Sequence, residues 1–323
     1  MNTRDAQAQR DDFYRRIDPS HLAPLWTRLK GLVRREPTPL GVPHRWRYRD
    51  VRPLVLEAAQ HITAEEAERR VLILENPGLR GGSQITGTLF SGLQLIMPGE
   101  SAPAHRHTQS ALRFIIEGGG AYTTVDDTKV MMEPGDFIIT PAWRWHLHGN
   151  ESAAPMVWLD GLDIPMVAHF NTSFREDGSE RATAAPASEA LPPIHYPYRE
   201  VRATLAERAR AGAPDAHLGH LVRYLDPANG GWAMPTIATT IRLLPGGFAT
   251  GPYRSSDSAI FVAVEGHGAL EVGETKLDMA PHDVAVVPGW MPYTLRAAED
   301  FVVFSFSDRA AQEKLGFFRE QRL

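Results

Sequence analysis

The sequence predicts an all-β protein made of two similar β-barrels, preceded by a helical N-terminal arm. Three observations lead to this prediction. From residue 70 onward, short apolar runs are separated by glycine and proline, as in sandwiches and barrels. The pattern of residues 117–146 recurs at 265–293, which indicates a second copy of one unit. Before residue 60, apolar residues recur instead at the three- and four-residue spacing of an amphipathic helix.

Composition limits what the protein can be. The chain has 323 residues, of which 43% are hydrophobic and 23% charged, enough for two ordinary domains. A net charge of −5 argues against nucleic acid as a partner. The absence of cysteine excludes disulfides and thiolate metal ligands. No apolar run is long enough to span a membrane and the N-terminus is polar, so we expect a cytoplasmic protein that does not bind membranes.

The helical arm is expected over residues 1–60. Residues 3–17 are polar and compatible with a helix. The apolar residues that follow with helical spacing are Leu22, Leu25, Trp26, Leu29 and Leu32. Prolines 37, 39 and 43 should end this helix and begin an extended segment. We expect Trp46 to anchor that segment on a barrel wall or on a neighbouring subunit.

The first barrel is expected over residues 61–170. Its predicted strands are the apolar runs Val71–Leu74, Leu93–Met97, Phe114–Ile116, Tyr122–Val125, Phe137–Thr140 and Met156–Leu159. Residues 171–198 lose this pattern and contain an alanine-rich stretch and Pro192-Pro193, which predicts a linker. A helix at about 199–211 should then open the second domain, residues 199–323.

The internal repeat is visible at two places. Glu117-Gly118-Gly119-Gly120 aligns with Glu265-Gly266-His267-Gly268 at an offset of 148 residues. The stretch Pro141–His146 aligns with Pro288–Tyr293 at an offset of 147. The two halves therefore repeat one β-unit.

Three histidines in the first unit have a spacing suited to a metal. His105 and His107 are two positions apart, so on a strand both side chains point to the same face. His146 comes 39 positions later, after another apolar run. If the strands fold back as a barrel, the three imidazoles can converge into an open site for divalent iron, copper, zinc or nickel. The alternative is that each histidine is hydrogen-bonded in a barrel core.

The second unit lacks these histidines. The positions that match His105, His107 and His146 hold Tyr253, Ser255 and Tyr293. Tyrosine and serine cannot reproduce a neutral site with three nitrogen ligands. We therefore expect the second barrel to hold no metal and to be mainly structural.

These motifs also resemble a known family. Gly99 with His105-Arg106-His107, and Gly135 with Pro141, His146 and Asn150, resemble the two cupin motifs. Residues 88–94, 103–114 and 158–163 are similar to the gentisate and salicylate 1,2-dioxygenase family, and the resemblance covers most of residues 60–320. It implies a bicupin, in which two jelly-roll barrels (double-stranded β-helices) follow one another.

The resemblance implies a ring-cleaving dioxygenase. Fe(II) would be held by His105, His107 and His146 alone, because Ala111 and Leu112 stand where many cupins have a glutamate ligand. An aromatic hydroxy acid and O2 would be the substrates. The enzyme would cleave gentisate between its carboxyl-bearing and hydroxyl-bearing carbons to give maleylpyruvate, in the catabolism of aromatic compounds. The family also implies a homo-oligomer, a tetramer.

Two further residues stand near the histidines. Arg113 lies on an otherwise apolar strand that enters the barrel, and a buried guanidinium needs an anionic partner. A substrate carboxylate would fit its planar geometry, and the alternative is an acidic group of the protein. His148 shares a strand face with His146. Substrate binding, acid–base catalysis and a structural role all remain open for His148.

The resemblance adds four pocket residues, and two positions depart from its pattern. Arg69 and Gln94 match positions on the carboxylate side of the substrate, although the match at Arg69 could shift to Arg70. Asp160 matches a carboxylate that orients a histidine or an arginine, with an ordinary ion pair as the alternative. Phe90 replaces a Trp or Tyr of the substrate pocket.

Leu147 is the second departure, because gentisate enzymes commonly have aspartate between the two histidines. Together with Phe90 it leaves salicylate, substituted salicylates and 1-hydroxy-2-naphthoate open as alternative substrates. Two other classes also stay open: a non-oxidative, metal-dependent cupin isomerase or hydrolase, and a cupin that only binds aromatic acids. Oxygen uptake during turnover would separate them from a dioxygenase.

Overall fold

The computed structural model describes residues 3–178 and 192–323, and the chain divides into two compact units. The first unit ends at Thr38 and contains α1 (Thr3–Ile17), the short 3-10 helix η1 (Asp18–Ser20) and α2 (Leu25–Leu32). Its described residues have no buried side chain. The amphipathic helix predicted from Leu22 begins at Leu25, directly after Pro24, because proline fits the start of a helix and not its interior.

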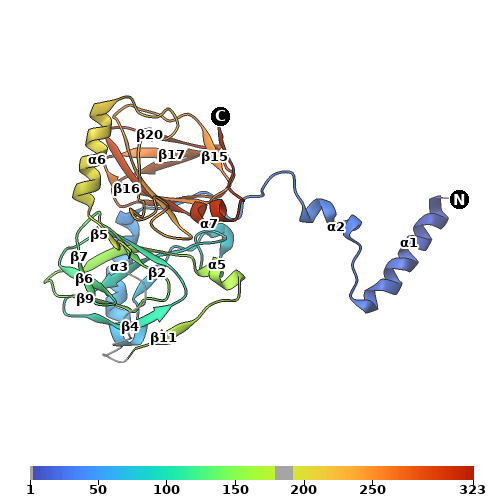
Figure 1. The fold of residues 1–323 in the computed structure, drawn as a ribbon, viewed down its shortest axis with the longest axis horizontal. Coiled ribbons are helices and arrows are strands. Elements are labelled where there is room, and N and C mark those ends of the chain that lie inside the picture. The colour runs from blue at the N-terminus through green and yellow to red at the C-terminus, as the bar shows by residue number, and fades with distance from the viewer. Residues whose placement is uncertain (1–2, 179–191) are drawn as a thin grey trace. The chain divides into compact units, whose positions relative to one another are not determined.

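The second unit, residues 39–323, contains two β-barrels, each made of two facing sheets (Figure 1). In the first barrel one sheet has the order β12-β8-β5-β10-β3-β2 and the other β11-β4-β9-β6-β7. The strands of this barrel are β2 (Val71–Ile73), β3 (Phe90–Ile96), β4 (Ser101–His107), β5 (Ala111–Glu117), β6 (Ala121–Val125), β7 (Thr128–Met132), β8 (Phe137–Thr140), β9 (His146–Asn150), β10 (Met156–Leu162), β11 (Arg175–Asp177) and β12 (His195–Tyr196). The two sheets enclose an apolar interior that includes Ile115 and Trp158.

The second barrel repeats this arrangement with the sheets β1-β19-β16-β21-β14-β13 and β18-β17-β20-β15-β22. Its strands are β1 (His44–Trp46), β13 (His220–Arg223), β14 (Ala238–Leu244), β15 (Tyr253–Ser255), β16 (Ala259–Glu265), β17 (Gly268–Val272), β18 (Thr275–Met279), β19 (Val284–Val287), β20 (Tyr293–Ala297), β21 (Phe301–Ser307) and β22 (Glu320–Arg322). The bicupin fold predicted from the repeat is therefore confirmed.

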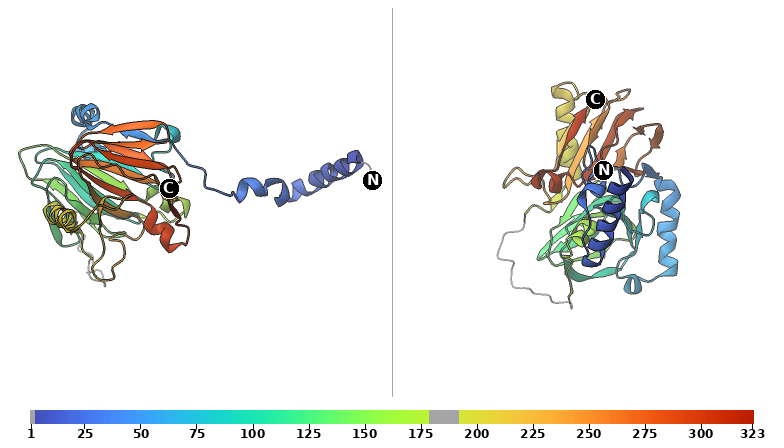
Figure 2. Two further views of the ribbon diagram at one scale, coloured as in Figure 1. Left: turned by 90° about the horizontal axis from the view of Figure 1, so that it is seen from above. Right: turned by 90° about the vertical axis from the view of Figure 1, so that its right-hand side faces the viewer.

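Helices cover the outside of the barrels. They are α3 (Tyr48–His61), α4 (Ala64–Ala67), η2 (Pro77–Leu79), α5 (Ile164–His169), α6 (Tyr198–Ala211) and α7 (Arg309–Lys314). The helix predicted at about 199–211 is α6, which lies beside β13 and β14 on the outside of the second barrel (Figure 2). Among the described residues, no helix has the length and apolar character needed to cross a bilayer.

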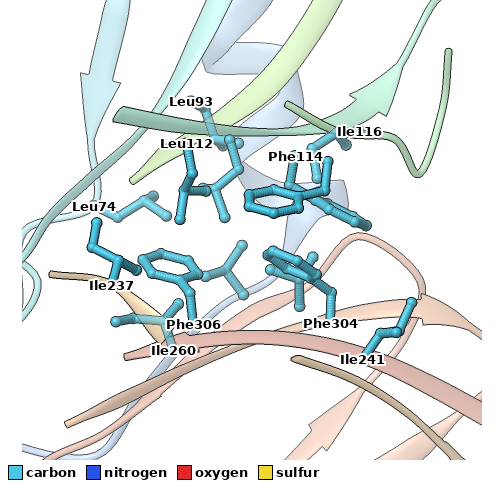
Figure 3. Packing of buried hydrophobic residues seen from close by; sticks show 14 of the residues in the cluster. Leu74, Leu93, Leu112, Phe114, Ile116, Ile237, Ile241, Ile260, Phe304 and Phe306 are labelled. Carbon is cyan, nitrogen blue, oxygen red and sulfur yellow. The ribbon is translucent and has the colours of Figure 1, made fainter. Parts of the chain in front are cut away.

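The two barrels share one hydrophobic core (Figure 3). Side chains alternate along β5, so Leu112, Phe114 and Ile116 enter this shared core while Arg113 and Ile115 face the interior of the first barrel. Phe114 stacks on Phe304 of the second barrel, with ring centroids 4.2 Å apart. The shared core thus holds β5 and its neighbours in place behind the interior of the first barrel.

This shared core should be sensitive to truncation. Phe304 has no exposed surface, so Phe304→Ala removes the stacked ring and leaves a cavity. We expect the free energy of unfolding to fall by about 3–5 kcal/mol, measured by urea denaturation. Phe170→Ala is the control, because Phe170 is 59% exposed and its loss should have little effect. An equal loss in both variants would contradict a shared core.

The arm is shorter than expected. Residues 39–60, which we expected in the arm, belong to the larger unit. Antiparallel pairing with β19 makes β1 an edge strand of the second barrel, and Trp46 packs against the shared core. The α3 helix then buries Val55 and begins where the backbone N–H of Tyr48 donates to Asp283 (2.8 Å). The partners of β1 and of Tyr48 lie more than 200 residues away in the sequence, so a local sequence pattern cannot predict these contacts.

The ends of the predicted linker, residues 171–198, pair with the first barrel. β11 pairs with β4, and β12 pairs with β8. Residues 179–191, the alanine-rich part of that prediction, lie outside the described residues.

Candidate metal and substrate site

Strand pairing brings the three predicted histidines together. β4 and β9 are antiparallel, and the Cα atoms of His105 and His146 are direct partners across them. His107 lies two residues further along β4, on the same face. One nitrogen from each ring lies within 4.8 Å of the others. Within the part of the chain that the structure describes, this is the one group of His, Asp or Glu side chains arranged to hold a metal ion.

Hydrogen bonds direct two of these rings toward the centre. The Nδ1–H of His107 donates to the carbonyl oxygen of Gln109 (2.9 Å), and that of His146 donates to the carbonyl oxygen of Arg144 (3.0 Å). A carbonyl oxygen can only accept, so Nδ1 carries the proton and Nε2 keeps its lone pair. Such bonds from the second ring nitrogen are typical of metal-binding histidines.

Burial keeps all three imidazoles neutral. It lowers the pKa of His105 to about 3 and that of His107 to about 4, and lowers the pKa of His146 well below its usual range. Nearby positive charges from Arg69 and Arg113 act in the same direction. Three neutral nitrogen donors on rigid strands fit a divalent first-row metal, although imidazole does not discriminate between iron and zinc.

The lowered pKa values predict how stability depends on pH. Below pH 6.5 the unfolded chain binds protons at His105 and His107 that the folded, metal-free protein does not bind, so stability falls as the pH falls toward about 4. Between pH 6 and pH 5 the metal-free protein should lose about 2 kcal/mol more than the His105→Gln/His107→Gln variant. Urea denaturation at both pH values measures this. The same slope in both proteins would contradict buried, neutral rings.

Arg113 has partners within the protein. Its Cα lies opposite that of Asp160 on the neighbouring strand β10, and Nε is 3.7 Å from Oδ1 of Asp160. Nη1 donates to Oγ1 of Thr140 (2.5 Å) and Nη2 donates to Nε2 of His148 (2.9 Å). The protein carboxylate considered as the alternative partner is therefore present. Thr140 was not among the predicted site residues, although it is the one residue with a hydroxyl group in the run Phe137–Thr140.

Asp160 orients Arg113 and is itself held by a tryptophan. Oδ1 of Asp160 accepts a hydrogen bond from Nε1 of Trp158 (3.0 Å). Burial raises the pKa of Asp160 to about 6, against the lowering effects of Arg113 and Trp158. The Arg113–Asp160 distance exceeds that of a hydrogen bond, and Nε of Arg113 has no hydrogen-bond partner. One donor of the guanidinium therefore remains without an acceptor.

His148 connects the histidine cluster to Arg113. It accepts the hydrogen bond from Arg113 at Nε2, so Nδ1 carries its proton, and Nδ1 has no partner in the structure. Burial, followed by the charge of Arg113, lowers the pKa of His148 well below its usual range. His148 is thus a neutral ring with one free N–H donor, 5.8 Å from His146 between ring centroids.

The remaining expected pocket residues occupy different places. Arg69 contacts the ring of His105, with Nη2 3.3 Å from Nε2, whereas Arg70 forms a two-point ion pair with Glu100. Arg69 and not Arg70 therefore lies beside the histidines. Burial, then the charge of Arg113, lowers the pKa of Arg69 to about 10, which still leaves it positively charged at neutral pH.

Gln94 and Phe90 both belong to β3. Gln94 alternates with the shared-core residues Leu93 and Leu95, so it faces the interior of the first barrel, where it is 4% exposed. Phe90 is the first residue of the strand and is half-buried. Leu147 is half-buried between His146 and His148, and strand alternation turns its side chain to the opposite face.

Comparison with known proteins identifies the family. The Cupin domain family matches residues 92–162. Gentisate 1,2 dioxygenase 1 of Aquipseudomonas alcaligenes is 45% identical over 97% of this chain and 96% of its own length. The chain belongs to the gentisate and salicylate 1,2-dioxygenase family.

Other members of this family support the same assignment. The 5-aminosalicylate 1,2-dioxygenase of a Comamonas species is 34% identical over 99% of this chain and 92% of its own length. The crystal structure of the salicylate 1,2-dioxygenase of Pseudoaminobacter salicylatoxidans with gentisate is 32% identical, with a TM-score of 0.89 over 97% of this chain and 93% of that one. The family resemblance seen in the motifs is therefore confirmed.

The second barrel has the same strand pairing at the equivalent positions, but tyrosines stand there in place of histidines. Tyr253 and Tyr293 are direct Cα partners across β15 and β20, just as His105 and His146 are across β4 and β9. The tyrosine positions inferred from the repeat are thus the structural equivalents of the histidine positions.

Proposed function

We propose that this protein is an Fe(II)-dependent gentisate 1,2-dioxygenase. The observation that carries the proposal is the cluster of three neutral histidines beside Arg113, whose Nε has no hydrogen-bond partner. The 45% identity to a gentisate dioxygenase over nearly the whole chain supports gentisate as the substrate. By this proposal the protein works in the cytoplasm as a homotetramer in the catabolism of aromatic compounds.

His105, His107 and His146 would hold the metal, in a cupin domain of residues 61–170, while the domain of residues 199–323 would hold none. When bound, Fe(II) supplies open coordination positions at which an aromatic hydroxy acid and O2 react. Three neutral ligands leave the full positive charge of the ion in place, which favours an anionic substrate.

The arginines would bind and orient the substrate carboxylate. Arg113 presents a guanidinium that Asp160 holds only at 3.7 Å, and Arg69 lies at the histidines with no carboxylate in direct contact among the described residues. Gln94 and Phe90 would line the pocket beside them. His148 would donate its free Nδ1–H to a substrate oxygen, since a neutral ring with Nε2 occupied by Arg113 has only that group to offer.

The overall reaction is gentisate plus O2 to maleylpyruvate. The bond between the carboxyl-bearing and the hydroxyl-bearing carbon breaks, and each of these carbons gains one oxygen atom from O2. No external reductant is needed, because the ring supplies all four electrons.

Other 2-hydroxybenzoates form the second candidate substrate class. Phe90 replaces a Trp or Tyr of the family pattern with a side chain that has no polar group, whereas Leu147 faces away from the histidines and would act only through packing. Relatives named for 5-aminosalicylate and salicylate are 34% and 32% identical. A less polar pocket would tolerate a substrate without the second hydroxyl. 1-Hydroxy-2-naphthoate belongs to the same class.

An oxygen electrode tests this proposal. The chain is reconstituted with ferrous ion and offered gentisate, salicylate, 5-aminosalicylate and 1-hydroxy-2-naphthoate. We expect the fastest oxygen uptake with gentisate, and two labelled atoms per product molecule from ¹⁸O2 after correction for exchange with water. Turnover without oxygen uptake would instead indicate an isomerase or hydrolase, and binding without turnover an aromatic-acid-binding cupin.

A further inference from the structure

The second barrel contains a polar cavity of about 90 Å³. Its wall includes the equivalents of the three histidines and of Arg113, which are Tyr253, Ser255, Tyr293 and Phe261. The cavity therefore occupies, in the second barrel, the place that the proposed iron site has in the first.

An arginine faces this cavity from a new position. Arg242 is the fifth residue of β14, as Gln94 is the fifth residue of β3. The position of Asp160 on β10 corresponds to that of Ser305 on β21 in the second barrel. Ser305 is hydrogen-bonded to Thr240 (2.7 Å). The charge has thus moved to another strand while its carboxylate partner has been lost.

Arg242 is deeply buried without a full set of partners. It is 5% exposed, and its Nε and Nη1 have no hydrogen-bond partner. Its guanidinium lies 5.6 Å from the centre of the Phe261 ring. Burying an unpaired guanidinium is costly, so a ligand that restores its bonds is strongly favoured.

Two other arginines around the cavity are occupied by ion pairs. Arg309 bonds to Glu313 (2.7 Å) and Glu320 (3.2 Å), and Arg322 bonds to Asp215 (2.9 Å). Arg242 has no ion pair with any described residue. Arg223, which also lines the cavity, is exposed and lies over the ring of Trp232, 5.3 Å from its centre. Because Arg242 is the buried arginine, an anion inside the cavity would be recognised by Arg242.

One acidic group also lines the cavity without being satisfied. Asp257 is 8% exposed and its Oδ1 has no hydrogen-bond partner. Arg242 and Asp257 both interact with Tyr293: burial raises the pKa of Tyr293, the charge of Arg242 and its hydrogen bond to Tyr293 lower it, and the charge of Asp257 raises it. The cavity thus offers free donors at Arg242 and a free acceptor at Asp257.

We propose that the second barrel binds a small hydroxycarboxylate, with its carboxylate on Arg242 and its hydroxyl donating to Asp257. A plain anion would satisfy the arginine but would lie against an unsatisfied carboxylate. The apolar wall made by Ala238, Ala259 and Phe261 suits the carbon atoms of such an acid. A cavity that accepts benzene measures about 150 Å³, so an acid of two to four carbons fits and the aromatic substrate does not.

Calorimetric titration of the iron-loaded full chain tests this proposal, with glycolate and lactate as the probes. Acetate, propionate, phosphate and chloride are the comparison ligands. We expect Arg242→Gln to weaken glycolate binding by about tenfold or more, since it removes a charged hydrogen-bond donor. Asp257→Asn should abolish the preference for glycolate over acetate. Arg296→Gln, an exposed arginine paired with Glu271, should change nothing.

Two further measurements keep the proposal testable. Gentisate turnover should be the same in Arg242→Gln as in the wild type, which separates this site from the proposed iron site. If Arg242→Gln fails to fold, Arg242→Met replaces it, and lactate should raise the melting temperature of the wild type but not of that variant. Glycolate binding unaffected by either substitution would place it elsewhere. No binding of any acid, or equal binding of chloride, phosphate and glycolate, would mean a water-filled cavity and overturn the proposal.

Discussion

Replacing His146 with alanine should remove bound iron and turnover together while the fold survives. The wild-type protein should retain close to one iron per chain, because the described residues bring one set of three histidines together. Losing one of three protein ligands leaves two imidazoles, too few to retain the ion through gel filtration. Elemental analysis and the oxygen electrode measure the two losses, and circular dichroism follows the fold. His105→Ala and His107→Ala should behave alike.

The matched control is His61→Ala, since His61 is an exposed histidine that interacts with Glu57 on α3. It should keep iron and activity. Normal iron content in any of the three site variants would remove that residue from the ligand set. Two tightly bound irons per chain would contradict a metal-free second barrel.

Replacing Arg113 with alanine should leave iron bound but raise KM and lower kcat for gentisate. A desolvated charge pair of this kind is worth ~2–5 kcal/mol, or roughly 30- to several-thousand-fold in kcat/KM. Part of the loss would arise because Asp160 and His148 lose the guanidinium that contacts them. Arg113→Lys should recover only part of the activity, because an ammonium group cannot make the planar two-point contact. Steady-state kinetics with parallel iron analysis measure these effects.

Phenols without a carboxylate separate the two roles of Arg113. They should be poor substrates for the wild type and should lose little more in Arg113→Ala. Asp160→Asn is the companion variant, because it removes the charge that holds Arg113 and leaves the guanidinium free for substrate. Equal losses for substrates with and without a carboxylate would make Arg113 a purely structural partner of Asp160. Arg69 would then be the residue that binds the substrate carboxylate.

Periodicity and the internal repeat were sufficient to predict two similar β-units, each built from short strands. Strand alternation alone places His105 and His107 on one face, and an offset of 147–148 residues matches Tyr253 and Tyr293 to the first-barrel histidines. These inferences succeed because alternation is a local property of the backbone. A repeated pattern reports a repeated fold, whatever the distance between the two copies.

Only the tertiary structure decided which partners the charged groups have. Arg113 and Asp160 are 47 positions apart in the sequence and become neighbours because β5 pairs with β10. The prediction that the residues of β1 belong to the arm was wrong because their partner strand, β19, is more than 200 residues away in the sequence. Whether a buried charge is paired depends on what faces it across a barrel. The sequence shows an arginine at position 242, but only the folded chain reveals that Arg242 is buried with two unpaired donors and has no ion pair with any described residue.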